Sequence, residues 1–477
     1  MSNTGSKNLK TNLAMIGNIL YFHMHQEKNE HATCVLKGMV ADGYGDEFAR
    51  ENNNEKRVEI YLEEEFAYER KTIIFAGVIG ELSVFHDGAS YQFKMILYSA
   101  TFLMDLKKKS RSFQDIQITY ESLMKKIMGE YDGGDLIDRL SYGKTIGKPI
   151  VQYEETDWDF IKRLASHFNG SILPASEFTS PKLFFGAIKE QDIGKLEQFS
   201  YQMEKRLDRY REWSAGEYPD YREMDSIQFQ IEDRNYYELG CRVNYQGMAF
   251  YIGKMDAFLE KGEAIFRYTL YTKNGMGQPY QYAEHIIGVS IQAEVLAVVK
   301  DKIKVKLEID SSQDVETAWE FPYQTLYTAQ GQGGWYCMPE KGDLVMIYFP
   351  SKKESEAVGT SSSRTGNGGK ERKASPEIKF FRTIYGKEIR FTPDSVEIIC
   401  EDRKTGKKKA HIILHDDDGV EISSMGDITV SSREGIRLEA ENEIEIAASE
   451  RICLHCKKGR IQMDSKIDIA GPDVRIN

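Results

Sequence analysis

The sequence has little of what marks several protein classes. Its six cysteines are spread over 477 residues and most stand alone, which excludes a disulfide framework and fits a reducing compartment. Long apolar runs are missing too, since the stretch from Ile73 to Gly80 is among the longest, so no segment is expected to span a membrane. Because the first ten residues are polar, we expect synthesis in the cytoplasm without a signal peptide.

An excess of positive charge is also absent. The chain carries 63 Lys and Arg against 75 Asp and Glu, a formal net charge of −12. A protein whose main ligand is nucleic acid needs a basic surface to neutralise phosphates, so nucleic acid is not expected as the main ligand. The length is too great for one core and predicts three or more domains.

Catalytic motifs are not recognisable either. No nucleophile with a neighbouring base and no pair of catalytic carboxylates stands out, so we predict no enzyme, no catalytic residues and no cofactor. Gly143-Lys144-Thr145 resembles the end of a phosphate-binding loop, but the glycine required five positions earlier is Asp138. A basic run, Lys107–Arg111, is interpreted as solvated surface, with an acidic neighbour as the second interpretation.

Three groups of candidate metal ligands have simpler interpretations. Cys453, His455 and Cys456 alternate along an expected strand, with Cys456 inward and the other two outward, which leaves too few ligands for tetrahedral zinc on either face. His415 to Asp418 falls in an expected turn, where acidic residues are common, and His23 and His25 share an expected strand face. We therefore predict no metal site, although the sequence leaves open whether the C-terminal region holds an ion.

The regular feature of the sequence is a repeat in its last part. Apolar residues two apart recur as Ile412/Leu414, Val420/Ile422, Ile428/Val430, Ile436/Leu438, Ile444/Ile446, Ile452/Leu454, Ile461/Met463, Ile467/Ile469 and Val474/Ile476. The first members are spaced by five steps of 8 residues and then by 9, 6 and 7. Each pair shares one face of a short strand, and the polar residue between them points the other way.

Short strands with so few inward side chains must stack on partners to bury them. A meander of hairpins from one chain would favour two-residue Asn-Gly or Gly-Gly turns, which most of these connections lack. We therefore favour three chains that wrap one axis, each supplying one side of a triangular prism. A single-chain β-solenoid and a flat sheet remain the alternatives.

The residues before the repeat predict a mainly β protein with one α/β segment. Short alternating strands over 34–103 and again from residue 224 predict two small barrels, and strands from about residue 288 predict a third, of Greek-key type. Between the first two lie a helix after Tyr120 and a second helix that Thr156 caps, with Trp158, Ile161 and Leu164 on one face. Residues 351–375 are rich in Ser, Gly and Lys and are expected to form a loop or linker.

Two motifs resemble a known family. The segment Trp158–His167, preceded by Glu154 and Glu155, resembles the helix found in VgrG and phage late-control D proteins, the hub and spike of contractile tails. The stretch from Gly331 to Val345, which includes Trp335, Pro339 and Gly342, resembles the segment that closes the spike's OB-fold in the same proteins. The order of motifs, barrels and repeat matches that family over most of the chain.

The resemblance implies a division of the chain. We expect a first hub β-barrel at 1–105, an α/β hub segment at 106–223, a second hub β-barrel at 224–285 and an OB-fold at 286–360. A linker and the start of the spike follow at 361–410, and a trimeric β-helix spike at 411–477. The expected site residues are structural: the hub helix residues Trp158, Ile161 and Leu164, the OB-closing residues Trp335, Pro339, Gly342 and Val345, and the spike core residues Ile428, Val430, Ile436, Leu438, Ile444, Ile446, Ile452 and Leu454.

The resemblance also implies a function. It predicts a homotrimer that joins a hexameric tube to a three-fold, membrane-piercing needle in a phage tail, a bacteriocin or a type VI-like apparatus, a particle that acts outside the structure that produces it. The implied partners are tail-tube and baseplate proteins, a small tip-capping protein and the target cell envelope. The alternative is a repeat-stalked fibre or adhesin that binds surface carbohydrate through the OB-like barrel.

Overall fold

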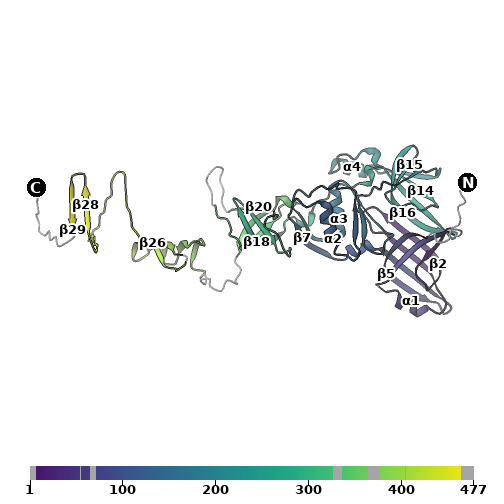
Figure 1. Cartoon of the computed structure of the whole chain (residues 1–477), viewed down its shortest axis with the longest axis horizontal. Helices are drawn as coiled ribbons and strands as arrows, with labels where there is room; N and C mark the ends of the chain where they lie inside the picture. The colour runs from purple at the N-terminus through teal and green to yellow at the C-terminus, as the bar shows by residue number, and fades with distance from the viewer. Residues whose placement is uncertain are drawn as a thin grey trace. The chain divides into compact units, whose positions relative to one another are not determined.

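The computed structural model describes residues 7–53, 55–64, 71–325, 336–363, 375–402 and 404–463. The chain divides into two compact units, Met1–Gly366 and Asn367–Asn477, which are described separately (Figure 1). Both units are built mainly from strands, as the sequence predicts. Within the described residues, none of the helices is both long enough and apolar enough to cross a membrane.

One twelve-stranded sheet dominates the N-terminal unit. Its path runs through β1 (Lys7–Thr11), β4 (Arg57–Glu64), β5 (Lys71–His86), β6 (Tyr91–Ser99), β3 (Thr33–Val40), β2 (Ile16–Glu27), β16 (Met248–Glu260), β17 (Glu263–Tyr271), β14 (Ile227–Asp233) and β13 (Tyr201–Lys205). β15 (Arg242–Tyr245) pairs with β16, and β12 (Asp192–Lys195) pairs with β15. A short helix, α1 (Gly45–Glu51), lies in the connection between β3 and β4, and η1 (Ala100–Met104) follows β6.

The two segments predicted as separate barrels are joined in this sheet. Antiparallel pairing of β2 with β16 places His25 opposite Asp256 and connects the strands of residues 7–99 to those of residues 192–271. A single hydrophobic core extends across the join, from Phe22 and Met24 to Phe250 and Met255. Among the described strands, the pairing closes neither segment into a ring. Strand β2 pairs with β3 along one edge and with β16 along the other, so its second edge is taken by β16 rather than by a strand of the first segment.

Most of the α/β segment packs around a second core, to which residues 207–226 contribute no side chain. The segment contains β7 (Lys108–Phe113), α2 (Tyr120–Met128), β8 (Asp135–Asp138), β9 (Ile150–Thr156), α3 (Asp157–Ser166), β10 (Ile172–Pro174), β11 (Lys182–Phe185), α4 (Leu207–Ala215) and η2 (Glu223–Ser226). Thr119 and Thr156 precede α2 and α3, and each side chain accepts a hydrogen bond from the backbone N–H of the residue three positions on, as N-caps do. The apolar faces of α2 and α3 are buried together.

A five-stranded antiparallel sheet completes the N-terminal unit. It runs β20 (Glu320–Pro322), β19 (Lys302–Leu307), β18 (Ser290–Val299), β21 (Leu344–Tyr348) and β22 (Val358–Ser363), and η3 (Asn274–Met276), η4 (Glu284–Ile286) and η5 (Glu354–Glu356) lie in the connections. An isolated bridge joins Tyr323, just beyond β20, to Gly359 of β22. Inward residues such as Val295, Ile303 and Val345 form a third core.

The C-terminal unit begins with a five-stranded antiparallel meander. Its strands are β23 (Lys379–Arg382), β24 (Lys387–Phe391), β25 (Ser395–Glu401), β26 (Lys408–His415) and β27 (Gly419–Ser424), so the sheet is continuous across the expected boundary at residue 410. Residues 425–451 form neither helix nor strand, and β28 (Ile452–Cys456) and β29 (Gly459–Met463) then form a hairpin. No β-helix is present within the described part of this unit.

The sequence argument against a meander of hairpins from one chain does not hold for β23–β27. That argument required two-residue turns with glycine, but longer turns connect these strands and are stabilised by their own side chains. In the loop between β25 and β26, the Asp402 carboxylate accepts hydrogen bonds from the backbone N–H groups of Lys404 and Thr405. In the turn between β26 and β27, Gly419 takes a positive φ of 79°, which glycine adopts without strain.

Candidate functional site

Helix α3, the expected hub helix, joins two parts of the N-terminal unit. Trp158, Ile161 and Leu164 lie on one face and are buried in the second core. Arg163 also has a buried side chain, and it reaches the five-stranded sheet instead: its guanidinium donates to Glu354 of η5 at 3.0 Å. Helix α3 therefore packs into the core of the α/β segment on one side and forms an ion pair with the five-stranded sheet region on the other.

The buried arginine is fully paired. It also donates to Glu155 at 2.9 Å and to the backbone oxygen of Val151 at 2.9 Å. Opposite charges raise the pKa of Arg163 against the effect of burial. Breaking a buried pair of this kind leaves a charge without a partner, which costs about 3–5 kcal/mol. The contacts of Arg163 therefore hold α3 against the η5 region, and their contribution depends on both charged partners being present.

Two further polar contacts strengthen the same junction. The Asp310 carboxylate accepts from the backbone N–H of Ser112 at 2.7 Å and from its hydroxyl at 2.5 Å. The Gln114 amide donates to the backbone oxygen of Val305 at 3.3 Å and accepts from the backbone N–H of Trp319 at 3.2 Å. Strand β7 is thus bound to the five-stranded sheet through backbone as well as side-chain groups, which favours a rigid junction.

The basic run that precedes this junction has acidic partners. Lys109 and Arg111 both pair with Glu130 and with Asp157, whose carboxylate is buried. Burial raises the pKa of Asp157, but hydrogen bonds from Lys109, Tyr131 and Gln152 and the Arg111 charge lower it below its usual value. Lys107 and Lys108 are exposed. The second interpretation of this run therefore holds for its inner residues.

The expected OB-closing residues lie in and before β21. Val345 is buried in the third core, Pro339 is buried, and Gly342 takes a positive φ of 91° while its N–H donates to the backbone oxygen of Val295. That turn ties the segment to β18. Trp335 lies outside the described residues.

An uncovered apolar face is the main feature of the C-terminal unit. Cross-strand pairing aligns Ile389, Ile398, Ile412 and Ile422 in one row and Phe391, Val396, Leu414 and Val420 in the next. Every one of these side chains is exposed, from 36% for Val396 to 65% for Val420. Large side chains rarely gather in the open unless they mark an interaction surface.

The opposite face of the same sheet is already satisfied within the chain. Arg382 pairs with Glu388 at 2.6 Å and with Glu401 at 2.8 Å, and Arg390 pairs with Glu388 at 2.6 Å. Ile399 is buried among these charges. The polar face needs no partner, so burial remains to be gained only on the apolar face.

Sequence reasoning placed the start of this face too late. Ile389/Phe391 and Val396/Ile398 repeat the apolar–polar–apolar signature within residues 361–410, which were expected to form a linker and the start of the spike. From Val396 to Ile412 the step is 16 residues, twice eight, because the loop of residues 402–407 intervenes. Comparing pairs at multiples of the step would have found Val396/Ile398, whereas Ile389/Phe391 lies seven residues earlier and outside that spacing. Arg163 gave no such signal, since its partner Glu354 lies far along the chain.

Seven of the eight expected spike core residues are also exposed, and the eighth, Ile452, is half-buried. The seven comprise Ile428, Val430, Ile436, Leu438, Ile444 and Ile446, in the stretch without assigned strands, and Leu454 in β28. In the hairpin, Ile452 lies opposite Met463 and Leu454 opposite Ile461. The side chain of Cys456 is outside the described set, so its expected inward direction is untested.

The remaining sequence candidates have structural surroundings. Thr145 forms an isolated bridge with Thr119, and the Lys144 ammonium lies over the ring of Phe168, so this segment is part of the fold rather than a loop leading into a helix. His415 ends β26 and the three aspartates form the turn to β27. A cavity of about 540 Å³ beside α3 is lined by both signs of charge, including Lys162, Arg163 and Glu217.

Comparison with known proteins gives a family for part of the chain. Residues 44–168 match the family described as phage tail baseplate hub (GPD). The resemblance is confirmed over these residues. They include the hub helix α3 and the ion-paired strand β7, so this hub-family segment carries one side of the junction described above.

Solved structures show the same fold over more of the chain. The E. coli c3393 protein, a component of the type VI secretion system with structural similarity to T4 bacteriophage tail proteins gp27 and gp5, matches with a TM-score of 0.51 and 13% identity, over 75% of this chain and 99% of that one. The Francisella PdpA–VgrG complex in its half-lidded form matches with a TM-score of 0.53 and 9% identity, over 88% of this chain and 87% of that chain. No curated protein sequence matches the chain.

Proposed function

We propose that this chain is the hub and spike subunit of a contractile injection apparatus. Residues 1–285 of its N-terminal unit act as the hub, and its C-terminal unit contributes one strand set to a three-chain needle. The observation that carries the proposal is the apolar face of β24–β27, which is continuous with the eight-residue repeat and which stays exposed among the described residues. The family match at residues 44–168 and the shared fold support the same function.

The occupant of the apolar face is a second and a third copy of the chain. The two rows contain eight exposed apolar side chains. Burying the remaining half of each contributes roughly 1 kcal/mol, on the order of 8 kcal/mol per chain before the costs of association. Copies of one chain present the same repeat at the same height, so their rows align without a separate partner.

In this arrangement the repeat of residues 411–477 forms the spike β-helix. Ile428, Val430, Ile436, Leu438, Ile444 and Ile446 face its axis, and the polar residues between them face water. The five-stranded sheet of residues 290–363 is the OB-fold that links spike to hub, held by the junction at Arg163. The division into hub barrels, α/β segment, OB-fold, linker and spike keeps the boundaries given above, except the one at residue 410, which the sheet β23–β27 crosses.

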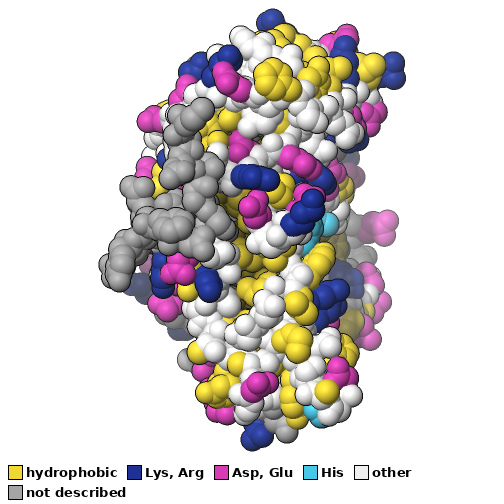
Figure 2. Space-filling view, turned by 90° about the vertical axis from the view of Figure 1, so that its right-hand side faces the viewer, with side chains coloured by type: hydrophobic (Ala, Val, Ile, Leu, Met, Phe, Trp, Pro, Cys, Tyr) yellow, Lys and Arg dark blue, Asp and Glu magenta, His cyan; other side chains and the backbone are white. Residues whose placement is uncertain are grey.

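The proposed role is mechanical rather than catalytic. A force that drives a needle through an envelope must pass from hub to spike, and the contacts of Arg163, Ser112 and Gln114 make the junction between the hub and the five-stranded sheet stiff. Figure 2 shows one face of the molecule on which Lys and Arg, Asp and Glu, and hydrophobic side chains are interspersed. Such a mixed surface suits tail-tube and baseplate proteins better than a phosphate backbone.

Light scattering and negative-stain imaging of the full chain test this proposal. We expect the mass of three chains and a three-fold particle with a broad head and a thin spike. The partners are then sought by adding tube, baseplate and tip proteins from the same apparatus. A stable, folded monomer at micromolar concentration would reject the three-chain needle.

A further inference from the structure

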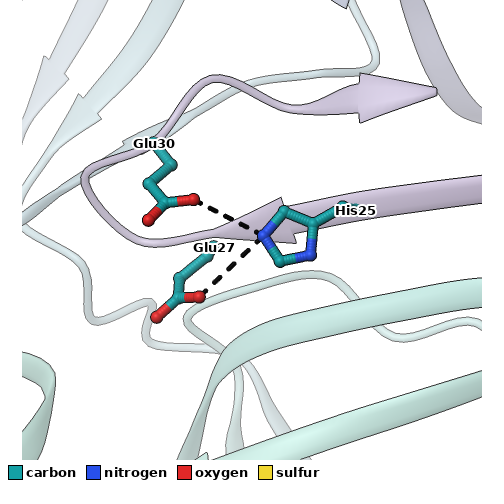
Figure 3. Close-up of side chains that lie close together, drawn as sticks. All are labelled: His25, Glu27 and Glu30. Atoms are coloured by element: carbon teal, nitrogen blue, oxygen red, sulfur yellow. Dashed lines mark ion pairs between the residues drawn. The ribbon is translucent and has the colours of Figure 1, made fainter.

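A separate cluster of polar side chains lies at the seam where β2 pairs with β16. His25 and Glu27 are close to the end of β2, Glu30 lies in the turn to β3, and Asp256 stands opposite His25 on β16. Figure 3 shows the ring of His25 directed toward both glutamates. The sequence predicted His23 and His25 to share a strand face. The structure adds the carboxylates of Glu27, Glu30 and Asp256 beside the His25 ring.

The imidazole of His25 is oriented by Asp256. The Asp256 carboxylate lies 2.7 Å from Nδ1 and accepts a hydrogen bond from the Nδ1–H group. In the neutral ring this leaves a lone pair on Nε2, which lies 3.5 Å from a Glu30 oxygen and 3.9 Å from a Glu27 oxygen. A carboxylate on the second nitrogen is the usual way in which proteins fix a histidine for metal binding.

The local charge favours a cation. Glu27, Glu30 and Asp256 contribute three negative charges, and Lys254, whose ammonium lies 3.4 Å from Glu27, compensates one of them. The neighbouring Lys28 does not help, because its ammonium donates to the backbone oxygens of Gly275 and Gly277 instead. With a neutral imidazole, the cluster keeps an excess of negative charge around Nε2.

The spacing also fits a metal ion. The candidate ligand atoms of His25, Glu27 and Glu30 all lie within 4.8 Å of one another, and among the described residues this is the one such group of three or more His, Cys, Asp or Glu. In a tetrahedral site with bonds of about 2.0–2.1 Å, ligand atoms lie about 3.4 Å apart. The separations of Nε2 from the Glu30 oxygen and from the Glu27 oxygen match this value within about half an ångström. Side-chain rotation can bring the two glutamate oxygens to the same spacing.

We propose that His25, Glu27 and Glu30 bind a divalent transition-metal ion such as Zn²⁺, with Asp256 holding the imidazole in place. An imidazole ligand disfavours Mg²⁺ and Ca²⁺, which take oxygen ligands. The Glu30 side chain is 57% exposed, which leaves a path for the ion to enter. Because the ligands lie beside the β2–β16 pairing, the ion fastens the turn after β2 at the seam between the two halves of the sheet.

The test uses the full chain after removal of metal by chelation. Isothermal titration calorimetry with ZnCl₂ should show one ion per chain with a dissociation constant of about 1–10 µM, and the thermal midpoint should rise by several degrees. Co²⁺ should give visible absorption without a thiolate charge-transfer band. Millimolar Mg²⁺ or Ca²⁺ should not displace either ion.

A matched pair of variants locates the site. Glu30→Gln removes one ligand oxygen's charge and should weaken Zn²⁺ binding at least about tenfold. Glu63→Gln makes the same change at an exposed position of β4 and should bind as the unmodified chain does. The proposal is overturned if the chain takes up no Zn²⁺ at 100 µM. It is equally overturned if Glu30→Gln binds normally, or if a thiolate band places the ion at Cys453 and its neighbours.

Discussion

Ile422→Asp tests whether the apolar face of the C-terminal unit is covered in the assembled protein. Ile422 is 60% exposed and lies opposite Ile412, in the row that continues to Ile398 and Ile389. Full burial of an isoleucine side chain contributes about 1.5–3 kcal/mol. Covering the remaining three-fifths therefore contributes roughly 1–2 kcal/mol in each chain.

The aspartate loses that contribution and places a carboxylate in an apolar contact, which costs a further few kcal/mol unless the group protonates. A trimer repeats the change three times, so the assembly should lose at least about 5 kcal/mol, more than a thousandfold in its dissociation constant. Sedimentation velocity at 1–50 µM should show a trimer for the unmodified chain and monomers for the variant.

Ser423→Asp is the matched control, since it introduces the same residue one position further on. Ser423 lies on the opposite face of β27, beside His411, and is only partly buried. Its change should alter stability by no more than about 0.5 kcal/mol. If the two variants sediment alike, or if only Ser423→Asp dissociates, the reasoning about the two faces is refuted.

Two further predictions concern the N-terminal unit. Arg163→Met leaves Glu155 and Glu354 buried without their cation and should lower the free energy of unfolding by about 3–5 kcal/mol; the double variant with Glu354→Gln should recover part of this loss in chemical denaturation, and no recovery would show that the pair is not the tie. Because the folded pKa of Asp157 is lowered, its stabilising effect is present above the unfolded pKa of about 3.9 and is lost as the pH falls through the folded value. Asp157→Asn should therefore be less stable at pH 7 and show a flatter decline between pH 5 and 2, and an unchanged decline would contradict this.

Local signals were sufficient to predict several of the individual elements, although the strands expected at Ile428/Val430, Ile436/Leu438 and Ile444/Ile446 are not present in the described residues 425–451. The helix expected after residue 120 is α2, and the cap expected at Thr156 accepts from the backbone N–H of Asp159 at 3.2 Å. These features depend on spacing within one turn of a helix or along one strand. The same holds for the apolar pairs of β26 and β27, which lie on one face as predicted.

Long-range pairing could not be predicted in this way. The contact between His25 and Asp256 joins residues 231 positions apart, and that between Arg163 and Glu354 joins residues 191 positions apart. Alternation says which face of β2 is buried but not which strand lies at its edge. The sequence therefore predicts two β segments correctly in kind and misses the pairing that joins them into one sheet.

The C-terminal sheet shows how far alternation can be taken. A period of two residues separates its sides, but either side could turn toward a core. The ion pairs decide between them, because Arg382 and Arg390 already satisfy Glu388 within one chain, whereas Ile398 and Ile412 remain open to water. A fold that is stable as a single chain buries its apolar face, whereas this sheet leaves its apolar face exposed and pairs the charges of its polar face internally. The chain thus encodes half of a contact, and under the proposed three-chain needle identical copies supply the other half.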